Sequence, residues 1–274
     1  MNLVRSELLK IRSTSIWWIL ALIYLPLWGI TLFFNYIQSD ALVNGDLGEV
    51  PADQADTFDA LKDPDALAAN LFTNGQFFGL MMVMLLGIIV VTSEFFHQTV
   101  TTTFLTVPHR SAVMLAKLVA AAGLGVVFWL VTTAANLLSG AAVLGAIGVD
   151  ARYTGAVWEA VGLNGLAYLL WAILGVGLGV LIRSQIGATV TGILLYLGGS
   201  IGAVILISTL AGRFGDWINN LQLLVPSLAS SLMVSGTDDL PGNPPQWAGA
   251  AVLIGYALVA GVVGTLLVRK RDIS

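Results

Sequence analysis

The residues best placed to do chemistry lie in one polar segment, residues 93–117, between two long apolar runs. Glu94 and His97 form a Glu-x-x-His pattern, which di-iron helix bundles use twice to hold their metal ions. The only other histidine is His109, and the residue three positions before it is Thr106. The second half of such a site is therefore missing, and we predict no metal site. The chain also has no cysteine, so few side chains could bind a metal or act as a catalytic acid or base. We therefore expect no enzymatic activity in this chain.

Two glycine motifs bear on nucleotide binding. Gly175, Gly177 and Gly179 look like part of a dinucleotide fingerprint, but they lie inside an apolar run and not between a strand and a helix. Together with Gly198 and Gly202 in the next run, they are better explained as small residues for close helix packing. No lysine follows a glycine, so the chain has no P-loop for ATP. We expect no cofactor in this chain.

The elements that position the polar segment are predicted from composition. The chain has 274 residues, of which 57% are hydrophobic and 10% charged, far below the roughly 25% charged residues of a soluble domain. Its apolar runs are continuous and of membrane length, which predicts helices. We therefore predict an all-α integral membrane protein with one domain and six spans: residues 16–36, 74–92, 112–147, 158–182, 186–211 and 247–268.

Other segments are assigned around these spans. Residues 1–15 form an amphipathic pattern typical of a helix on the inner membrane surface, although a plain positive flank for the first span remains an alternative. Residues 37–73 and 212–246 are expected to be outer loops, the second with helical pieces in the interface or over a cavity. The third span is overlong, so we expect its outer part to bend, to re-enter the membrane or to run in the interface near Gly140 and Gly145. The first run is too long for a signal peptide and is expected to stay in the membrane.

Charge predicts the orientation. The loops on one side carry three acids, Glu7, Glu94 and Asp272, against most of the basic residues: Arg5, Lys10, Arg12, Arg110, Lys117, Arg183, Arg269, Lys270 and Arg271. Basic loops remain in the cytoplasm, so this side is predicted to be inner. An even number of spans also requires both termini to share a side. We therefore predict that both termini are cytoplasmic.

Polar residues inside the spans are few. Five of them could line a pathway, although hydrogen bonding between helices is the favoured reading: Thr132, Asn136, Asn164, Tyr168 and Thr189. No ionisable side chain is predicted clearly at mid-membrane, where proton- and ion-coupled carriers usually need one. This weakens the hypothesis of a secondary carrier.

The polar segment itself predicts a short helix on the inner surface. It begins near Glu94 and ends at Pro108, because the residue before a proline is pushed out of helical geometry. Arg110 and Lys117 then mark the return of the chain into the bilayer.

This pattern resembles the permease subunits of ABC-2 type exporters. Their second inner connection commonly reads Glu, four residues, Thr, a short stretch, Pro-x-Arg and a Lys, and the matching positions here are Glu94, Thr99, Leu105, Pro108, Arg110 and Lys117. The family often has glycine where this chain has Gln98, and basic residues where it has Thr101 and Thr102. In layout the resemblance covers the whole chain.

The resemblance implies a coupling helix, within residues 94–108, that docks on a separate cytoplasmic ABC ATPase, where ATP and Mg bind. The residues expected to take part are Glu94, His97, Gln98, Thr99, Val100, Thr103, Leu105, Pro108 and Arg110. A second permease copy or homologue would complete an exporter of amphipathic or hydrophobic cargo in a prokaryotic plasma membrane, with the lipid bilayer but no nucleic acid as further partner. A non-transporting membrane anchor or assembly subunit is the alternative function, and a secondary carrier is a weaker one.

Overall fold

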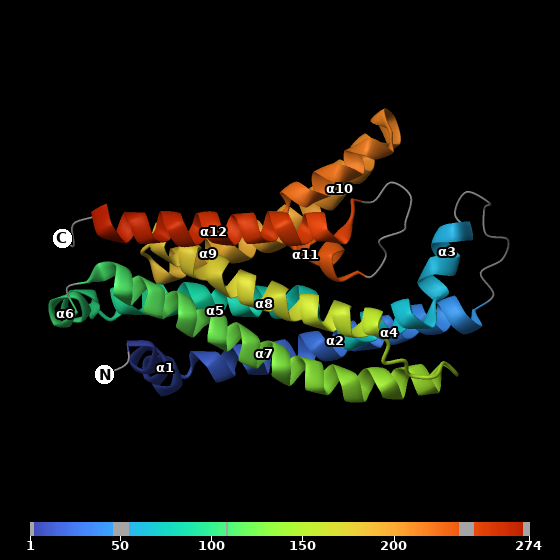
Figure 1. The fold of residues 1–274 in the computed structure, drawn as a ribbon, viewed down its shortest axis with the longest axis horizontal. Coiled ribbons are helices and arrows are strands. Elements are labelled where there is room, and N and C mark those ends of the chain that lie inside the picture. Colours follow the sequence, from blue (N-terminus) through green and yellow to red (C-terminus); the bar gives the residue numbers. More distant parts are fainter. Residues whose placement is uncertain (1–2, 46–54, 108, 236–243, 271–274) are drawn as a thin grey trace.

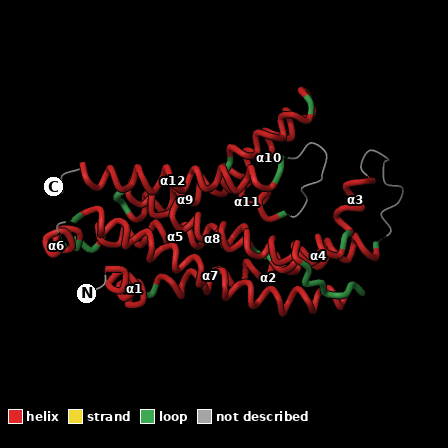
Figure 2. The backbone as a smooth tube through the Cα atoms, in the orientation of Figure 1, coloured by secondary structure: helices red, strands yellow, loops and turns green. Residues whose placement is uncertain are grey.

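The computed structural model describes residues 3–45, 55–107, 109–235 and 244–270. This part of the chain contains helices and no strand (Figure 2). Most of the helices lie roughly along one direction and form an elongated bundle (Figure 1). The predicted all-α class is therefore confirmed for the described residues.

Six helical segments are long and apolar enough to cross a membrane, so the chain is a multi-pass membrane protein. They follow the predicted order, with somewhat different bounds: α2 (Ile16–Asn44), α4 (Pro64–Phe72) with α5 (Gln76–Phe96), α7 (Arg110–Ala146), α8 (Gly155–Leu181), α9 (Gln185–Ile193) with α10 (Gly199–Phe214), and α12 (Gln246–Lys270).

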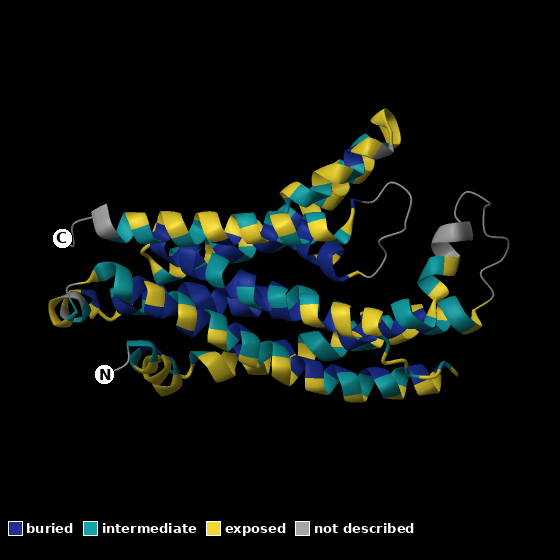
Figure 3. Ribbon diagram, in the orientation of Figure 1, coloured by how far each residue is buried: buried dark blue, intermediate teal, exposed yellow. Residues whose placement is uncertain are grey.

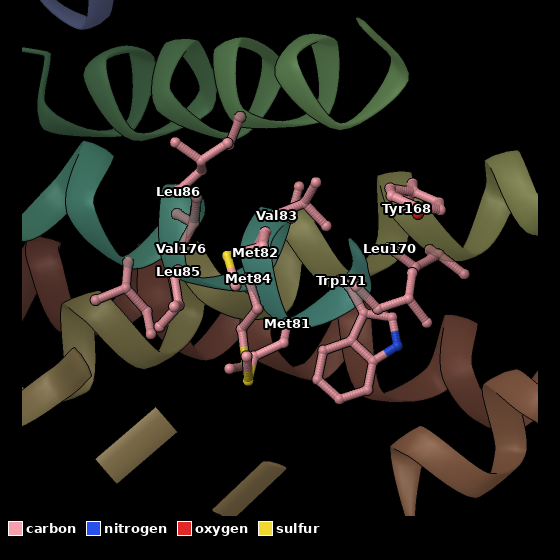
Figure 4. Close-up of a cluster of buried hydrophobic side chains, with 14 of the residues drawn as sticks. Met81, Met82, Val83, Met84, Leu85, Leu86, Tyr168, Leu170, Trp171 and Val176 are labelled. Atoms are coloured by element: carbon pink, nitrogen blue, oxygen red, sulfur yellow. The ribbon is translucent and has the colours of Figure 1, made fainter. Parts of the chain in front are cut away.

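The centre of the bundle is formed by α5 and α8, which pack along each other. Buried side chains concentrate on these two helices, whereas α2, α10 and α12 expose much of their surface (Figure 3). Met81, Met82 and Met84 of α5 lie in this core with Trp171 of α8 (Figure 4). The exposed apolar faces of the outer helices suit contact with lipid, which is as apolar as the side chains themselves.

Glycines set the distance between these central helices. A Cβ on Gly175 would lie 2.1 Å from the carbonyl oxygen of Met84, and one on Gly179 would lie 2.8 Å from that of Ile88. A Cβ on Gly177 would lie 2.7 Å from Ala260 of α12. The packing role predicted for these three glycines is confirmed. For Gly198 and Gly202 of the fifth span, an added Cβ would meet no described residue within 4 Å, so their predicted packing role stays a prediction.

The predicted outer loop 37–73 is largely helical. The first span continues to Asn44, and α3 (Ala55–Lys62) and α4 follow. Asp63 caps α4 by accepting a hydrogen bond from the Asp65 backbone at 3.2 Å, and Pro64 occupies the first helical position, where proline fits well. Leu71 and Phe72 of α4 are buried against α7 and α8 in a second core. The predicted loop thus contains helices, and the apolar helix α4 extends the second span.

The third span has no break near Gly140 and Gly145. The helix α7 is continuous over 37 residues, which corresponds to about 55 Å and exceeds a hydrocarbon core of about 30 Å. Gly140 instead admits Phe72, whose ring would lie 2.8 Å from an added Cβ. The glycine therefore serves contact between α4 and α7 and does not break the helix.

The fifth span has an interruption of its own. A π-helical segment, Leu194–Gly198, separates α9 from α10, and α10 diverges from the bundle (Figure 1). The chain then forms a 3-10 segment, η2 (Asp216–Leu224), and α11 (Pro226–Val234), both in the predicted outer loop 212–246. Trp171 donates a hydrogen bond to Ser230 of α11 at 2.7 Å. This confirms helical pieces in that loop, and α11 packs on α8 and α12.

Candidate functional site

Four charged side chains meet at the end of the bundle where α6 (Val100–Thr106) lies. They are Glu7 and Lys10 of α1 (Leu3–Ser13), Glu94 of α5 and Lys117 of α7, and we call them the ionic cluster. The Lys117 ammonium lies 2.7 Å from Glu7 Oε2 and 2.9 Å from Glu94 Oε1. The Lys10 ammonium lies 2.7 Å from Glu7 Oε1 and 2.6 Å from Glu94 Oε1. Each ammonium therefore bridges both carboxylates.

Burial makes this arrangement costly to disturb. Glu7, Glu94 and Lys117 are only 4–6% exposed. Two carboxylates and two ammonium groups balance one another, and Lys117 also donates to the Val90 carbonyl at 3.3 Å. Removing one member of a buried pair leaves an uncompensated charge, which typically costs about 3–5 kcal/mol. The cluster therefore holds α1, α5 and α7 in one relative position.

Lys10 is the most exposed member of the cluster, with a side chain that is 45% exposed. Burial lowers the pKa of Lys10, but hydrogen bonds and charge attraction from Glu7 and Glu94 outweigh it and raise the pKa above the ordinary 10.5. The Lys10 ammonium is thus fully charged at neutral pH.

The local sequence explains how α1 reaches the cluster. The helix is separate from α2, with a break at Thr14 and Ser15, which agrees with the predicted N-terminal helix. Glu7 is its buried residue, whereas Leu8 and Leu9 are exposed. One face therefore docks on the bundle through a carboxylate, while leucines remain free for the membrane surface.

Glu94 also fixes the start of α6. Its carbonyl oxygen accepts a hydrogen bond from the Thr99 backbone at 2.9 Å, and its Oε1 accepts one from the Thr103 hydroxyl at 3.5 Å. Val100 is buried at the base of α6, whereas Leu105 is 80% exposed. The helix α6 lies at the same end of the bundle as α1 and the end of α12 (Figure 1). It therefore presents Leu105 outward from an anchored base.

The connection between α5 and α6 is strained at one residue. Gln98 has a φ of +56°, and it is the only residue other than glycine with positive φ among the described residues. This conformation is uncommon for a side chain with a Cβ and natural for glycine. The chain therefore makes a tight turn at Gln98, between α5 and the start of α6.

The remaining residues predicted for this segment are placed as follows. His97 ends α5 and is exposed, as is Thr99. Arg110 begins α7 and donates to the Val268 carbonyl of α12 at 3.4 Å. Pro108 lies outside the described residues. The structure thus joins Glu94, Thr99 and Thr103 by hydrogen bonds, and His97 lines a second cavity with Glu94 and Thr99.

A cavity of about 570 Å³ opens beside the ionic cluster. It is lined by the ends of α5, α7, α8 and α12, and by the base of α6. Its charged lining residues are Glu94, Lys117 and Arg183, and most of the others are apolar.

The five polar span residues lie away from this cavity. Thr132, Asn136, Asn164 and Tyr168 are buried, and Thr189 donates to the Gln185 carbonyl of its own helix at 2.8 Å. Asn136 bonds between helices, because its Oδ1 accepts from Trp28 at 2.6 Å and its amide donates to the Asn74 carbonyl at 2.9 Å. The Oδ1 of Asn164 has no hydrogen-bond partner among the described residues.

Two features of the site were missed from the sequence. Glu7 was read only as one acid on the basic side, although it is the sole acid among the first fifteen residues. Lys117 was read as a marker of membrane entry, whereas it is a buried member of the cluster. The isolated acid in a basic helix was a usable signal, since Glu7 and Lys10 are three positions apart, but it could not reveal the partner on α7.

Comparison with known proteins yields one family. A family model described as "Protein of unknown function (DUF2705)" matches residues 61–274, which include Glu94 and Lys117 of the cluster but not α1. No curated protein matches the chain. Because the matched region covers well over half of its length, the chain belongs to the DUF2705 family of proteins of unknown function.

Proposed function

We propose that this chain is the membrane-spanning permease subunit of an ATP-driven ABC exporter. It would work with a second permease half and with a separate cytoplasmic ATPase that binds ATP and Mg. The cargo is amphipathic or hydrophobic, because the described spans carry little charge away from the ionic cluster. The protein would lie in a prokaryotic plasma membrane, with both termini in the cytoplasm.

The observation that carries this proposal is the anchoring of α6 by Glu94. A helix that receives movement from an ATPase must pass it to the spans by contact. Glu94 belongs to α5, contacts α6 through Thr99 and Thr103, and joins α7 through Lys117. A displacement of α6 is therefore carried directly into the second and third spans.

The ion pairs of the cluster are comparable in free energy to the conformational switch that α6 would have to transmit. Moving a two-state population from 1:99 to 99:1 takes about 5.5 kcal/mol of differential binding. Breaking a buried ion pair costs about 3–5 kcal/mol, and the cluster has two contacts between buried partners, those of Lys117 with Glu7 and with Glu94. The cluster is then strong enough for α6 to move with the spans instead of detaching from them.

Two observations support the proposed orientation. Both described chain ends lie at the same end of the bundle as α6 (Figure 1). The loops at that end hold most of the basic residues, which favours the cytoplasm. In this orientation Leu105 faces the cytoplasm on α6, available to a groove in the ATPase.

Cross-linking from α6 tests the proposal. The chain has no cysteine, so Leu105→Cys provides a unique attachment point on an exposed side chain. In intact cells carrying the native gene neighbourhood, a photoactivatable linker on this cysteine should capture a protein that contains a P-loop, identified by mass spectrometry.

The matched control is Leu224→Cys, an exposed leucine of η2. It should capture no P-loop protein, because η2 follows the fifth span on the proposed outer side. Capture of the same ATPase from both positions, or only proteins without a P-loop from Leu105→Cys, would contradict the proposal and favour a membrane anchor.

A further inference from the structure

The cavity beside the ionic cluster is lined by a positive charge that no other described residue pairs with. Glu94 and Lys117 are paired with each other. Arg183 has no ion pair or hydrogen bond within the described part of the chain, and its guanidinium lies 5.8 Å from the ring centroid of Phe95. Within the described ranges, Arg183 is therefore an unpaired cation at the cavity lining, beside an aromatic ring.

The polar groups near Arg183 suit a phosphate. The cavity is also lined by Gln98 and Thr101, which supply amide and hydroxyl donors. Both are exposed and hence accessible. A guanidinium recognises phosphate oxygens by paired hydrogen bonds, so these groups form a recognition set for a phosphodiester.

An apolar groove begins next to this cavity. It has a volume of about 440 Å³ and runs between α7, α8 and α12. Leu118 and Leu266 line the groove, and their chain neighbours Lys117 and Leu267 line the cavity. The charged cavity and the apolar groove are therefore adjacent on two helices.

The length of the groove matches one leaflet of a membrane. On α12 its lining extends from Ile254 to Leu266, which corresponds to about 18 Å along a helix. Half of a hydrocarbon core of about 30 Å is about 15 Å. A ligand with its charged head at Arg183 would thus place an acyl chain along the groove and reach the bilayer midplane.

We infer that Arg183 and the α7–α8–α12 groove form a binding site for an anionic phospholipid of the leaflet on the α6 side. The headgroup phosphate would bind Arg183, Gln98 and Thr101, and one acyl chain would lie against Leu118, Gly261 and Leu266. Basic pockets between membrane helices on the cytoplasmic side commonly hold such headgroups. The site contacts both α12 and the base of α6, so the lipid would brace α6, and its binding requires no ATPase.

Native mass spectrometry of the full-length protein in detergent tests this inference. The probes are dioleoyl phosphatidylglycerol, dioleoyl phosphatidylcholine with identical chains, and glycerol 3-phosphate as a headgroup without chains. Both lipids present a phosphate to Arg183, but the zwitterionic lipid also carries a choline ammonium, which the guanidinium repels. We therefore expect the anionic lipid to bind about tenfold more tightly than the zwitterionic one, which corresponds to about 1.4 kcal/mol. Glycerol 3-phosphate should not compete.

Two pairs of variants separate the headgroup from the chain. Arg183→Gln should abolish the preference for the anionic lipid, whereas Arg213→Gln, an exposed arginine at the end of α10, should keep it. Gly261→Leu should weaken binding of both lipids, since its side chain would enter the groove beside Leu118. Gly255→Leu lies on the same helix outside the groove and should bind as wild type does.

Equal binding of the two lipids to the wild type would overturn the inference, as would an unchanged preference in Arg183→Gln. Full competition by glycerol 3-phosphate would show a free phosphate site instead of a lipid site. Size-exclusion profiles identical to that of the wild type confirm that each variant is folded.

Discussion

Lys117 illustrates how a charged residue can be kept inside a membrane bundle. It lies seven positions into α7, about 10 Å from the start of that helix, and is almost fully buried. An isolated ammonium in this position would be strongly unfavourable. Glu7 and Glu94 compensate the charge, and Lys10 balances the second carboxylate. The members of the cluster therefore depend on one another.

This dependence predicts non-additive mutations. Glu7→Gln and Lys117→Met should each lower the free energy of unfolding. The double variant keeps Lys10 paired with Glu94, so its loss of stability should be smaller than the sum of the two single losses. We expect a coupling energy of about 0.5–3 kcal/mol from unfolding in detergent. Lys117→Met combined with the distant Arg213→Gln should be additive within about 0.5 kcal/mol. Additivity of the first pair would show that the cluster is not a unit.

Lys10 gives the cluster a pH dependence. Its pKa in the folded protein is raised above 10.5, so its charge stabilises the fold fully below about pH 10.5. This contribution is lost as the pH rises through the folded pKa. We expect the melting temperature of the wild type to fall more steeply above pH 10.5 than that of Lys10→Arg, because arginine stays charged. Parallel curves for the two proteins would contradict this.

Among the elements, α8 shows why glycine position matters more than glycine content. Gly175 meets the backbone of α5, which cannot move aside, whereas Gly198 of the fifth span has open space. The spacing of small residues predicted the packing face of α8 correctly. It could not distinguish this face from that of the fifth span, because a sequence does not show whether a partner helix is present.

A matched pair of substitutions tests this difference. Gly175→Ala should destabilise the protein by about 1–3 kcal/mol, since the added methyl group collides with the carbonyl of Met84. Gly198→Ala should be neutral or stabilise by about 0.5–1 kcal/mol, because alanine favours the helical state. The free energies of unfolding in detergent provide the comparison. Equal effects at the two positions would mean that α5 and α8 are not in close contact.

The break in the second span and the docking of α1 and α4 were not predicted from the sequence, and each has a physical reason. The long second span is broken at Thr73–Gly75, where Gly75 has a φ of +74°. The Asn74-Gly75 pair is a turn signal, but both residues were placed at the start of the predicted apolar span 74–92 and the signal was not used. The helix α4 before it has acidic capping residues that resemble loop composition. Chain-local patterns predicted the spans, whereas contacts between distant segments decided where α1 and α4 dock.

At the scale of the whole molecule, one end of the bundle combines several features. The ionic cluster, the base of α6, the charged cavity and the end of α12 all lie there. In contrast, α10 diverges and leaves an exposed apolar surface (Figure 3). A permease needs a rigid cytoplasmic end, which transmits the movement of α6 to the spans. It also needs exposed helical faces that contact lipid and a second permease half. This division of roles is the basis of the proposed function.

The most direct test is the rate of ATP hydrolysis by the complex of this chain with the proposed ATPase partner in lipid vesicles. Leu105→Asp changes an exposed residue of α6 and spares the ionic cluster, while Leu224→Asp makes the same change on η2. The account predicts that Leu105→Asp reduces hydrolysis to the rate of the ATPase alone and that Leu224→Asp retains the full rate. Full hydrolysis in the Leu105→Asp complex, with the protein correctly inserted, would contradict the claim that α6 is the coupling element.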